Sequence, residues 1–146
     1  MSSVFFKSFC LTAAICMFTM CSPSTRTYVV KGDTSADIQA AIDKASDKGG
    51  GKVVVPAGTY DVGSIRLKSN IELHLEKGAL LLGADKSEAY DSFPEDVCSI
   101  RPEKSSKVLV YAFDSQNIAI TGEGVIDGNG LAFFDTTTVV NGYFSK

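Results

Sequence analysis

Few residues of this chain have the type and spacing that catalysis or ligand binding requires. His74 is the sole histidine, and a strand that alternates over Ile71–Leu75 would turn it to the same side as Glu72 and Glu76. Such a group could supply a general base or a ligand, but a polar strand face in contact with solvent is the commoner reason for this pattern. We interpret it as the polar face and keep the chemical role as the alternative.

Two further places carry carboxylates. Glu95 and Asp96 are adjacent, with Asp91 nearby, which is an arrangement that general acid and base pairs can use. They lie in a polar stretch, where charge usually serves solvation, so we assign them no role. Asp127 stands in an Ile-Asp-Gly turn, where we expect a turn-forming residue, with contact to substrate as the alternative.

No cofactor or metal is expected from the sequence. The run Gly49–Lys52 has the glycines of a phosphate loop, but Val53 stands where serine or threonine is needed, and a helical pattern precedes the glycines. His74 and Cys98 alone cannot close a metal site. Because no histidine is placed to pair with it, Cys98 is interpreted as a small loop residue and not as a nucleophile.

Length and charge restrict the class of protein. The 146 residues are enough for one modest domain, and the hydrophobic content of 45% is enough for a packed core. Acidic residues outnumber basic ones by 17 to 14, and the basic residues are scattered singly, which disfavours nucleic acid as a partner. We therefore expect one globular domain that does not bind nucleic acid.

Residues 1–20 have the pattern of an export signal. Lys7 is the single charged residue before Phe9–Met20, an uncharged run of 12 residues, which is short of the ~20 that span a bilayer. Cys21 follows in a context that resembles a bacterial lipoprotein signal, so we expect lipidation at Cys21 and membrane contact only through that anchor. The expected location is the cell envelope or the periplasm. Cleavage at another site and a retained membrane anchor are the alternatives.

One amphipathic helix is predicted near the start of the exported chain. It follows a tether and short strand over residues 21–32, and Thr34, with its neighbours Asp33 and Ser35, supplies N-cap side chains. The glycines after Lys48 would end it. Its apolar residues recur at helical spacing: Ile38, Ala41, Ile42 and Ala45.

The rest of the chain is a series of short β-favouring runs. Gly, Asn, Asp or Pro separates them, no second helical pattern occurs, and no Asn-Gly or Asp-Gly pair joins adjacent runs into a hairpin. Stacked strands are therefore expected in place of a meander. The runs are Val53–Val55, Ile65–Leu67, Ile71–Leu75, Ala79–Leu82, Val108–Val110, Ile118–Ile120 and Val125–Ile126.

An internal repeat supports this stacking. Asn70 begins the segment Asn-Ile-Glu-Leu, and Asn117, 47 positions later, begins Asn-Ile-Ala-Ile. Since asparagine tolerates the left-handed conformation of a tight bend, both residues are predicted to occupy the same corner of a solenoid, two turns apart. The polar stretch Ala84–Lys107 would be an insertion on one face, which either contacts sugar or covers the edge of a coil.

Four stretches occur in an order that resembles a known family. They are Asp33–Ile42, Gly49–Tyr60, Leu67–Ile71 and Gly122–Gly130. Together they are similar to the N-terminal part of glycoside hydrolase family 28, the polygalacturonase and rhamnogalacturonase group, within the pectate-lyase-like superfamily. The resemblance implies an all-β fold over residues 33–146, a right-handed parallel β-helix of about three to four coils with an N-terminal capping helix.

The resemblance also implies an activity and a partner. The family hydrolyses α-linked galacturonic acid in pectin, an acidic plant polysaccharide, by an inverting mechanism with acid and base roughly 6.5 to 9.5 Å apart. Its catalytic residues lie in the motifs Asn-Thr-Asp, Asp-Asp, Gly-His-Gly and Arg-x-Lys of later coils, and none is assigned to this chain. We expect an N-terminal fragment that is inactive alone. The alternatives are a non-catalytic polysaccharide-binding or structural surface lipoprotein, and a fragment of a lyase or epimerase of the same fold.

Overall fold

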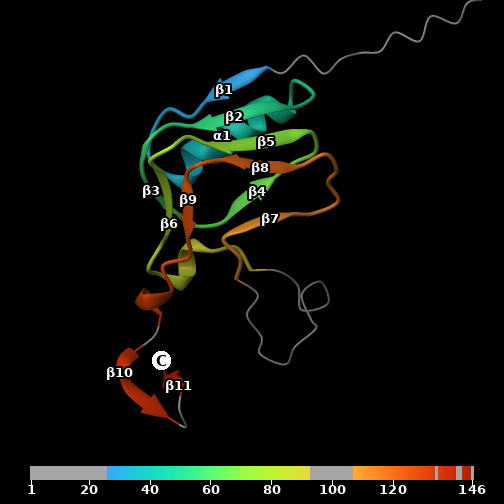
Figure 1. Ribbon diagram of the computed structural model, residues 1–146. Coiled ribbons are helices and arrows are strands. Elements are labelled where there is room, and N and C mark those ends of the chain that lie inside the picture. The colour runs from blue at the N-terminus through green and yellow to red at the C-terminus, as the bar shows by residue number, and fades with distance from the viewer. Residues whose placement is uncertain (1–25, 93–106, 134, 141–142, 146) are drawn as a thin grey trace, which may run out of the picture.

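The structure is a computed structural model, and it describes residues 26–92, 107–133, 135–140 and 143–145. Short strands dominate this part of the chain, as the sequence predicts (Figure 1). In chain order the elements are β1 (Thr27–Val29), α1 (Ser35–Ser46), β2 (Gly51–Val55), β3 (Gly58–Val62), β4 (Ile65–Leu67), β5 (Ile71–Leu75), β6 (Ala79–Gly83), the 3-10 helix η1 (Ser87–Ala89), β7 (Val110–Ala112), β8 (Ala119–Gly122), β9 (Val125–Asp127), the 3-10 helix η2 (Gly130–Ala132), β10 (Asp135–Val140) and β11 (Tyr143–Ser145).

Three parallel sheets enclose the core. Their strand orders are β1-β2-β5-β8, β3-β6-β9 and β4-β7, and all neighbours within them are parallel. The chain passes from the first sheet to the second and then the third, and repeats this path, which is the winding of a parallel β-helix (Figure 1). Strands β10 and β11 pair antiparallel with each other, a pairing that the sequence did not predict.

Helix α1 begins and ends where its local chemistry predicts. The Thr34 hydroxyl accepts a hydrogen bond from the backbone N–H of Asp37, and the Asp37 carboxylate accepts one from the backbone N–H of Thr34, which together form a capping box. At the other end Gly49 and Gly50 have φ of 89° and 112°, in the left-handed region, and the Gly50 N–H donates to the Ala45 carbonyl. Between these two ends, the apolar residues of α1 are buried in the core cluster.

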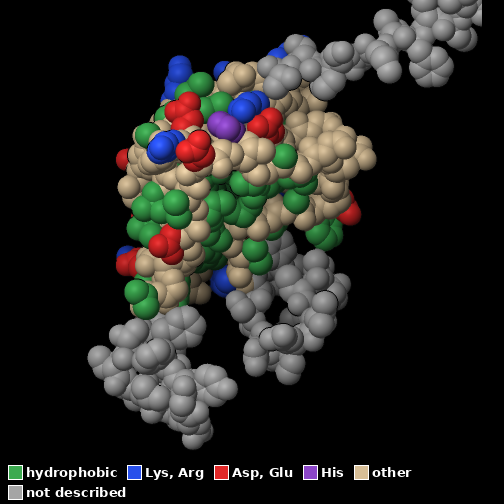
Figure 2. Space-filling model, in the orientation of Figure 1, with side chains coloured by type: hydrophobic (Ala, Val, Ile, Leu, Met, Phe, Trp, Pro, Cys, Tyr) green, Lys and Arg blue, Asp and Glu red, His purple; other side chains and the backbone are tan. Residues whose placement is uncertain are grey.

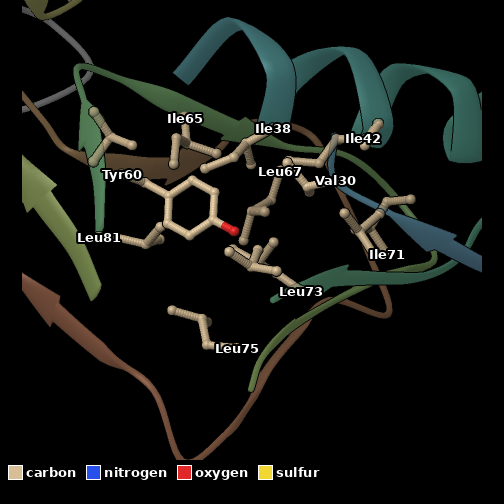
Figure 3. Close-up of a cluster of buried hydrophobic side chains, with 14 of the residues drawn as sticks. Val30, Ile38, Ile42, Tyr60, Ile65, Leu67, Ile71, Leu73, Leu75 and Leu81 are labelled. Atoms are coloured by element: carbon tan, nitrogen blue, oxygen red, sulfur yellow. The ribbon is translucent and has the colours of Figure 1, made fainter. Parts of the chain in front are cut away.

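The core gathers the inward side chains of all three sheets and of α1 (Figure 3). Alternation in β5 is strict, with the apolar residues of Ile71–Leu75 buried and the polar ones half-buried, as predicted. Tyr60 enters the same cluster because its hydroxyl donates to the Pro56 carbonyl at 3.0 Å, so no polar group is left unpaired. Fully buried side chains include Ile38, Ile42, Ile65, Ile71, Leu73, Leu81, Val53, Val55 and Val62.

The repeated asparagines occupy equivalent corners, but they are one turn apart. Asn70 and Asn117 have φ of 62° and 56°, and Asn117 Nδ2 donates to Asn70 Oδ1 at 2.9 Å. Strand β5 pairs directly with β8, with Glu72 opposite Ala119, so the predicted two-turn separation is wrong. The polar stretch between β6 and β7 adds its length to this one turn, which the sequence spacing alone could not reveal. The total of three to four coils stays a prediction.

Candidate functional site

A polar array lies on the outward face of the sheet β1-β2-β5-β8. Glu72 Oε1 accepts a hydrogen bond from the Thr121 hydroxyl at 2.7 Å and lies 3.2 Å from Lys52 Nζ. Thr121 Oγ1 in turn lies 2.7 Å from His74 Nδ1. Figure 2 shows the histidine with acidic and basic side chains around it. We call these four residues the polar array.

Strand register brings the array together. Lys52 on β2 is opposite Glu72 on β5, and His74 on β5 is opposite Thr121 on β8. Outward residues alternate with buried ones along β5, and residues that lie opposite one another on parallel strands face the same side, so Lys52 and Thr121 face outward with Glu72 and His74. Three separate passes of the chain therefore contribute to one surface site.

The hydrogen bonds fix which atoms carry protons. A hydroxyl has one proton to donate, and Thr121 gives it to Glu72. The bond between Thr121 and His74 must then be donated by His74 Nδ1. In the neutral ring Nε2 then has no proton and carries a lone pair, so Nε2 is the atom that can accept a proton or bind a ligand.

Glu72 is held in its ionised form. The Thr121 hydroxyl first, and then Lys52, hold the pKa of the Glu72 carboxyl below its usual range. A carboxyl with a lowered pKa is a poor general acid near neutral pH, because it carries no proton to give. The array can therefore orient the imidazole and accept hydrogen bonds, but Glu72 is not suited to protonate a leaving group.

An open depression adjoins the array. Its volume is about 410 Å³, and it holds both signs of charge, with Lys77 Nζ and Glu123 Oε2 3.9 Å apart at its exposed rim. Glu76 is exposed here, so the predicted trio of Glu72, His74 and Glu76 shares one side of the strand but only the first two belong to the array. The lining residues are His74, Leu75, Glu76, Lys77, Gly122 and Glu123.

The other predicted candidates lie apart from this site. Asp127 Oδ1 accepts a hydrogen bond from the backbone N–H of Asn129 at 2.8 Å, as a turn-forming aspartate does. Asp91 Oδ2 accepts one from the Tyr111 hydroxyl at 2.9 Å. The remaining candidates lie outside the described residues: Cys21, Glu95, Asp96 and Cys98.

Sequence reasoning missed two members of the array. Thr121 follows the repeat at the position equivalent to His74, so extending the repeat by one residue would have found it. Lys52 follows a run of glycines, and the sequence alone predicts no ion pair for it. Its position opposite Glu72 depends on the register between β2 and β5, for which no sequence signal was available.

The triplet Arg66-Leu67-Lys68 has the spacing of the Arg-x-Lys motif, although no catalytic residue was predicted in this chain. The structure gives this triplet a role in attaching α1. Lys68 Nζ lies 2.8 Å from Asp43 Oδ1 and lowers the pKa of the Asp43 carboxyl, chiefly through that hydrogen bond. The backbone N–H of Arg66 donates to Gln39 Oε1 at 2.9 Å, and Leu67 is buried. These contacts join β4 to the helix and assign the triplet no chemistry.

The ends of the polar stretch Ala84–Lys107 are fixed to the sheets. The Ser64 hydroxyl donates to the Val108 carbonyl and accepts from the backbone N–H of Asp91, while Lys107 Nζ donates to the Tyr90 carbonyl. Tyr90 packs edge-on against Phe133 with ring centroids 6.2 Å apart, and its hydroxyl donates to the Ala84 carbonyl at 2.8 Å. The predicted sugar contacts of residues 93–106 lie outside the described part of the chain.

Within the described ranges, no helix combines the length and apolar character that crossing a membrane requires. In the same ranges no group of three or more histidine, cysteine, aspartate or glutamate side chains is arranged to hold a metal ion.

Comparison with known proteins gives close relatives for part of the chain. No family model matches it. An exo-poly-α-D-galacturonosidase from Dickeya chrysanthemi is 38% identical over 116 residues, which cover 70% of this chain and 19% of that protein. The structure of the family 28 exopolygalacturonase of Yersinia enterocolitica is similar with a TM-score of 0.59 and 34% identity, over 71% of this chain and 21% of that one.

A third relative is a candidate glycosyl hydrolase from Parabacteroides merdae, whose crystal structure matches with a TM-score of 0.61 and 31% identity. The match covers 73% of this chain and 46% of that one, so this chain spans less than half the length of each of these three relatives. The sequence identity and the structural similarity both agree with the family resemblance of the four stretches named in the sequence analysis. Over its matched part, the chain is similar in both sequence and fold to polygalacturonases, among them one of glycoside hydrolase family 28.

Proposed function

We propose that this chain is part of an exported glycoside hydrolase of the polygalacturonase type, which hydrolyses α-linked galacturonic acid in pectin-type polysaccharide. The observation that carries the proposal is the match of 38% identity over 116 residues to an exo-poly-α-D-galacturonosidase. The three parallel sheets supply the scaffold on which such an enzyme is built. The substrate class and the reaction come from these relatives and not from a site in the described residues.

Within this proposal the described residues have a supporting role. They would form the first coils of a right-handed parallel β-helix, with α1 as the cap that shields the apolar core at one end. The acid and base that an inverting mechanism places roughly 6.5 to 9.5 Å apart would come from other coils. The expected number of coils, three to four, and the fragment status belong to this proposal as well.

Export and anchoring are further parts of the proposal. The apolar run Phe9–Met20 after Lys7 supports an export signal, and Cys21 directly after it supports lipidation. The enzyme would then act at the cell envelope or in the periplasm on an acidic polysaccharide. Labelling with a radioactive fatty acid would test the anchor, since Cys21→Ser should abolish incorporation while Cys98→Ser should not.

The activity is tested by assay of the whole gene product on polygalacturonate. The gene is sequenced through and beyond the codon for Lys146, and the product is incubated with polygalacturonate and, as control, with a neutral α-glucan. We expect saturated galacturonic acid to be released from polygalacturonate alone. An unsaturated product absorbing in the ultraviolet would assign a lyase, and absence of any release would favour a non-catalytic surface protein.

The chain of 146 residues provides the matched comparison. Because no catalytic carboxylate is assigned to it, it should release no reducing sugar under the same conditions. Release that persists after repeated purification would contradict this and would direct attention to the carboxylates of the chain itself.

A further inference from the structure

The sheet of β4 and β7 presents a second outward surface, on a different sheet from the polar array. Its two strands lie side by side (Figure 1), with Arg66 opposite Tyr111. Ile65 and Leu67, the neighbours of Arg66 on β4, are buried, so Arg66 points outward and its side chain is exposed. Since residues opposite one another on parallel strands face the same side, Tyr111 lies beside Arg66 on the outer surface.

An exposed aromatic side chain extends this surface. Phe113 is 45% exposed and follows Tyr111 by two positions, so continuing the alternation of β7 by one residue places both side chains on the same side. The Tyr111 hydroxyl donates to Asp91 Oδ2 at 2.9 Å, and the Ser115 hydroxyl donates to the Phe113 carbonyl at 2.8 Å. These bonds hold the Tyr111 side chain and the backbone after β7 in place. We call Arg66, Tyr111 and Phe113 the β4–β7 face.

Arg66 gives the β4–β7 face a positive charge. Among the residues that the structure describes, no carboxylate lies within ion-pair distance of its guanidinium, whereas Lys68 Nζ is already paired with Asp43 at 2.8 Å. Burial, and then Asp91, raise the pKa of the Tyr111 hydroxyl, and the charge of Arg66 opposes that rise, as a cation near the ring does. Arg66 is therefore close to Tyr111 and open to an incoming anion.

The surroundings restrict the kind of anion. Asp91 is bonded to Tyr111, and the exposed Asp114 follows Phe113 directly, so carboxylates flank the cation. These carboxylates repel a chain of closely spaced phosphates, which requires a positive groove, and they repel an acidic peptide in the same way. A sugar that carries one carboxylate has hydroxyl groups that donate to such acceptors.

The spacing of the face matches one such sugar. Arg66 and Phe113 are diagonal neighbours on adjacent strands, with Cα atoms about 8 Å apart from the strand spacing and the two-residue rise. A long arginine and an aromatic ring can meet the two ends of a single pyranose ring across this gap. The guanidinium pairs with a carboxylate through two parallel hydrogen bonds, and the aromatic ring packs on the apolar face of the sugar.

We propose that the β4–β7 face binds a uronate-containing oligosaccharide, with the carboxylate of one sugar on Arg66, its ring packed on Phe113 and its hydroxyl groups toward Tyr111 and Asp91. The choice of galacturonate as the uronate rests on the proposed function. The face would hold the polysaccharide on the protein and would take no part in its cleavage.

Calorimetric titration of the 146-residue chain with trigalacturonate tests the proposal. We expect saturable binding. Phe113→Ala and Arg66→Gln should each weaken binding roughly tenfold, since one removes the packing surface and the other removes the charged partner of the carboxylate. Arg66→Lys should recover part of the loss, because it restores the charge without the two-pronged guanidinium.

Two variants on another sheet are the matched controls. Lys31→Gln removes an exposed cation that follows β1, and Val29→Ala trims a side chain on β1 that is 53% exposed. Both should leave binding unchanged, and circular dichroism checks that every variant folds. Carboxyl-reduced trigalacturonate is the matched ligand. It should bind the parent chain as weakly as trigalacturonate binds Arg66→Gln, and Arg66→Gln should weaken its binding no further.

Three results would overturn the proposal. The first is absence of binding at the highest soluble concentration of trigalacturonate, by calorimetry and by changes in amide chemical shifts. The second is an equal loss in Lys31→Gln, which would indicate general attraction of charge. The third is tighter binding of a glutamate hexapeptide or an oligothymidylate that Arg66→Gln abolishes, which would assign the face to another class of polyanion.

This test and the assay of hydrolysis fail separately. Release of galacturonic acid by the whole gene product, without binding of trigalacturonate to the 146-residue chain, would remove this inference and leave the proposed function. Binding that depends on Arg66 and Phe113, with no hydrolysis by the whole gene product, would remove the proposed activity and leave the β4–β7 face as a sugar-binding surface.

Discussion

The layer of β5 and β6 and the layer of β8 and β9 are built alike and end up in different environments. Both begin at an asparagine corner, and both turn alternate apolar side chains toward the core. The inward residues of the first layer are fully buried, while Ile120 and Ile126 of the second are partly exposed. The comparison shows that, in stacked sheets, burial is decided by the neighbouring layer as much as by the local pattern.

The comparison is tested most directly by truncating equivalent residues. Leu73→Ala should lower the free energy of unfolding by about 2 to 5 kcal/mol, because it opens a cavity in a closed layer. Ile120→Ala should cost less than about 1 kcal/mol, since its side chain is already near solvent. Urea unfolding followed by circular dichroism measures both. Equal losses would show that the second layer is covered in solution.

Gly122 tests the comparison from the opposite direction. It lies in the layer of β8 and β9, which is partly exposed, but its substitution is expected to be costly. Gly122 has a φ of 103°, and a Cβ there would meet the backbone of Leu75 in the layer below. Gly122→Ala should therefore cost about 2 kcal/mol or more, from left-handed strain and overlap together. Gly128→Ala is the control, since no atom lies within 4 Å of its added Cβ, and it should change unfolding in urea very little.

The N-cap of α1 provides a further test, in a part of the molecule where the layers are covered. Thr34→Ala removes the hydroxyl that accepts from the Asp37 N–H and should lower stability by about 1 kcal/mol, while the neighbouring Ser35→Ala should have little effect. Thermal unfolding at neutral pH measures the difference. If Thr34→Ala and Ser35→Ala lower the stability equally, the hydrogen bond from the Asp37 N–H to the Thr34 hydroxyl does not stabilise the fold.

The smallest effect is expected in the polar array, which links β2, β5 and β8. Glu72→Gln should cost no more than about 1 kcal/mol at neutral pH, because the side chain is partly in solvent. The pKa of Glu72 is lowered in the fold, so its contribution is present above the unfolded pKa and is lost as pH falls through the folded value.

The measurement for the array is urea unfolding at a series of pH values. The stability difference between the parent chain and Glu72→Gln should shrink on acidification below pH ~4.5, near the ordinary pKa of glutamate. Glu76→Gln, at an exposed side chain outside the array, is the control and should leave the free energy of unfolding nearly unchanged. A difference that grows toward low pH would contradict the assigned role of Thr121 and Lys52.

Local features of this fold could be predicted from the sequence. The capping chemistry of Thr34 and Asp37, the glycine end of α1 and the alternation of Ile71–Leu75 depend on residues close together in the chain. The match of Asn70 to Asn117 was also visible, because the same corner requires the same residue type.

Relations between distant segments could not be predicted in the same way. The spacing between the two asparagines does not show whether one long turn or two short ones separate them, and pairing of β5 with β8 settles the question. The same limit hid Lys52 and Thr121 from the candidate site, because outward neighbours on parallel strands are set by register and leave no local pattern.

The fixed ends of the stretch between β6 and β7 have a consequence for how this fold can vary. Ser64 joins Asp91 and Val108, and Lys107 reaches Tyr90, so the two ends of that stretch meet beside the sheets. Closing a loop twice as long costs only about 0.6 kcal/mol more. Sequence can therefore be added, shortened or exchanged between these anchors while the strands keep their register, which makes this position a natural place for grafting a new recognition segment.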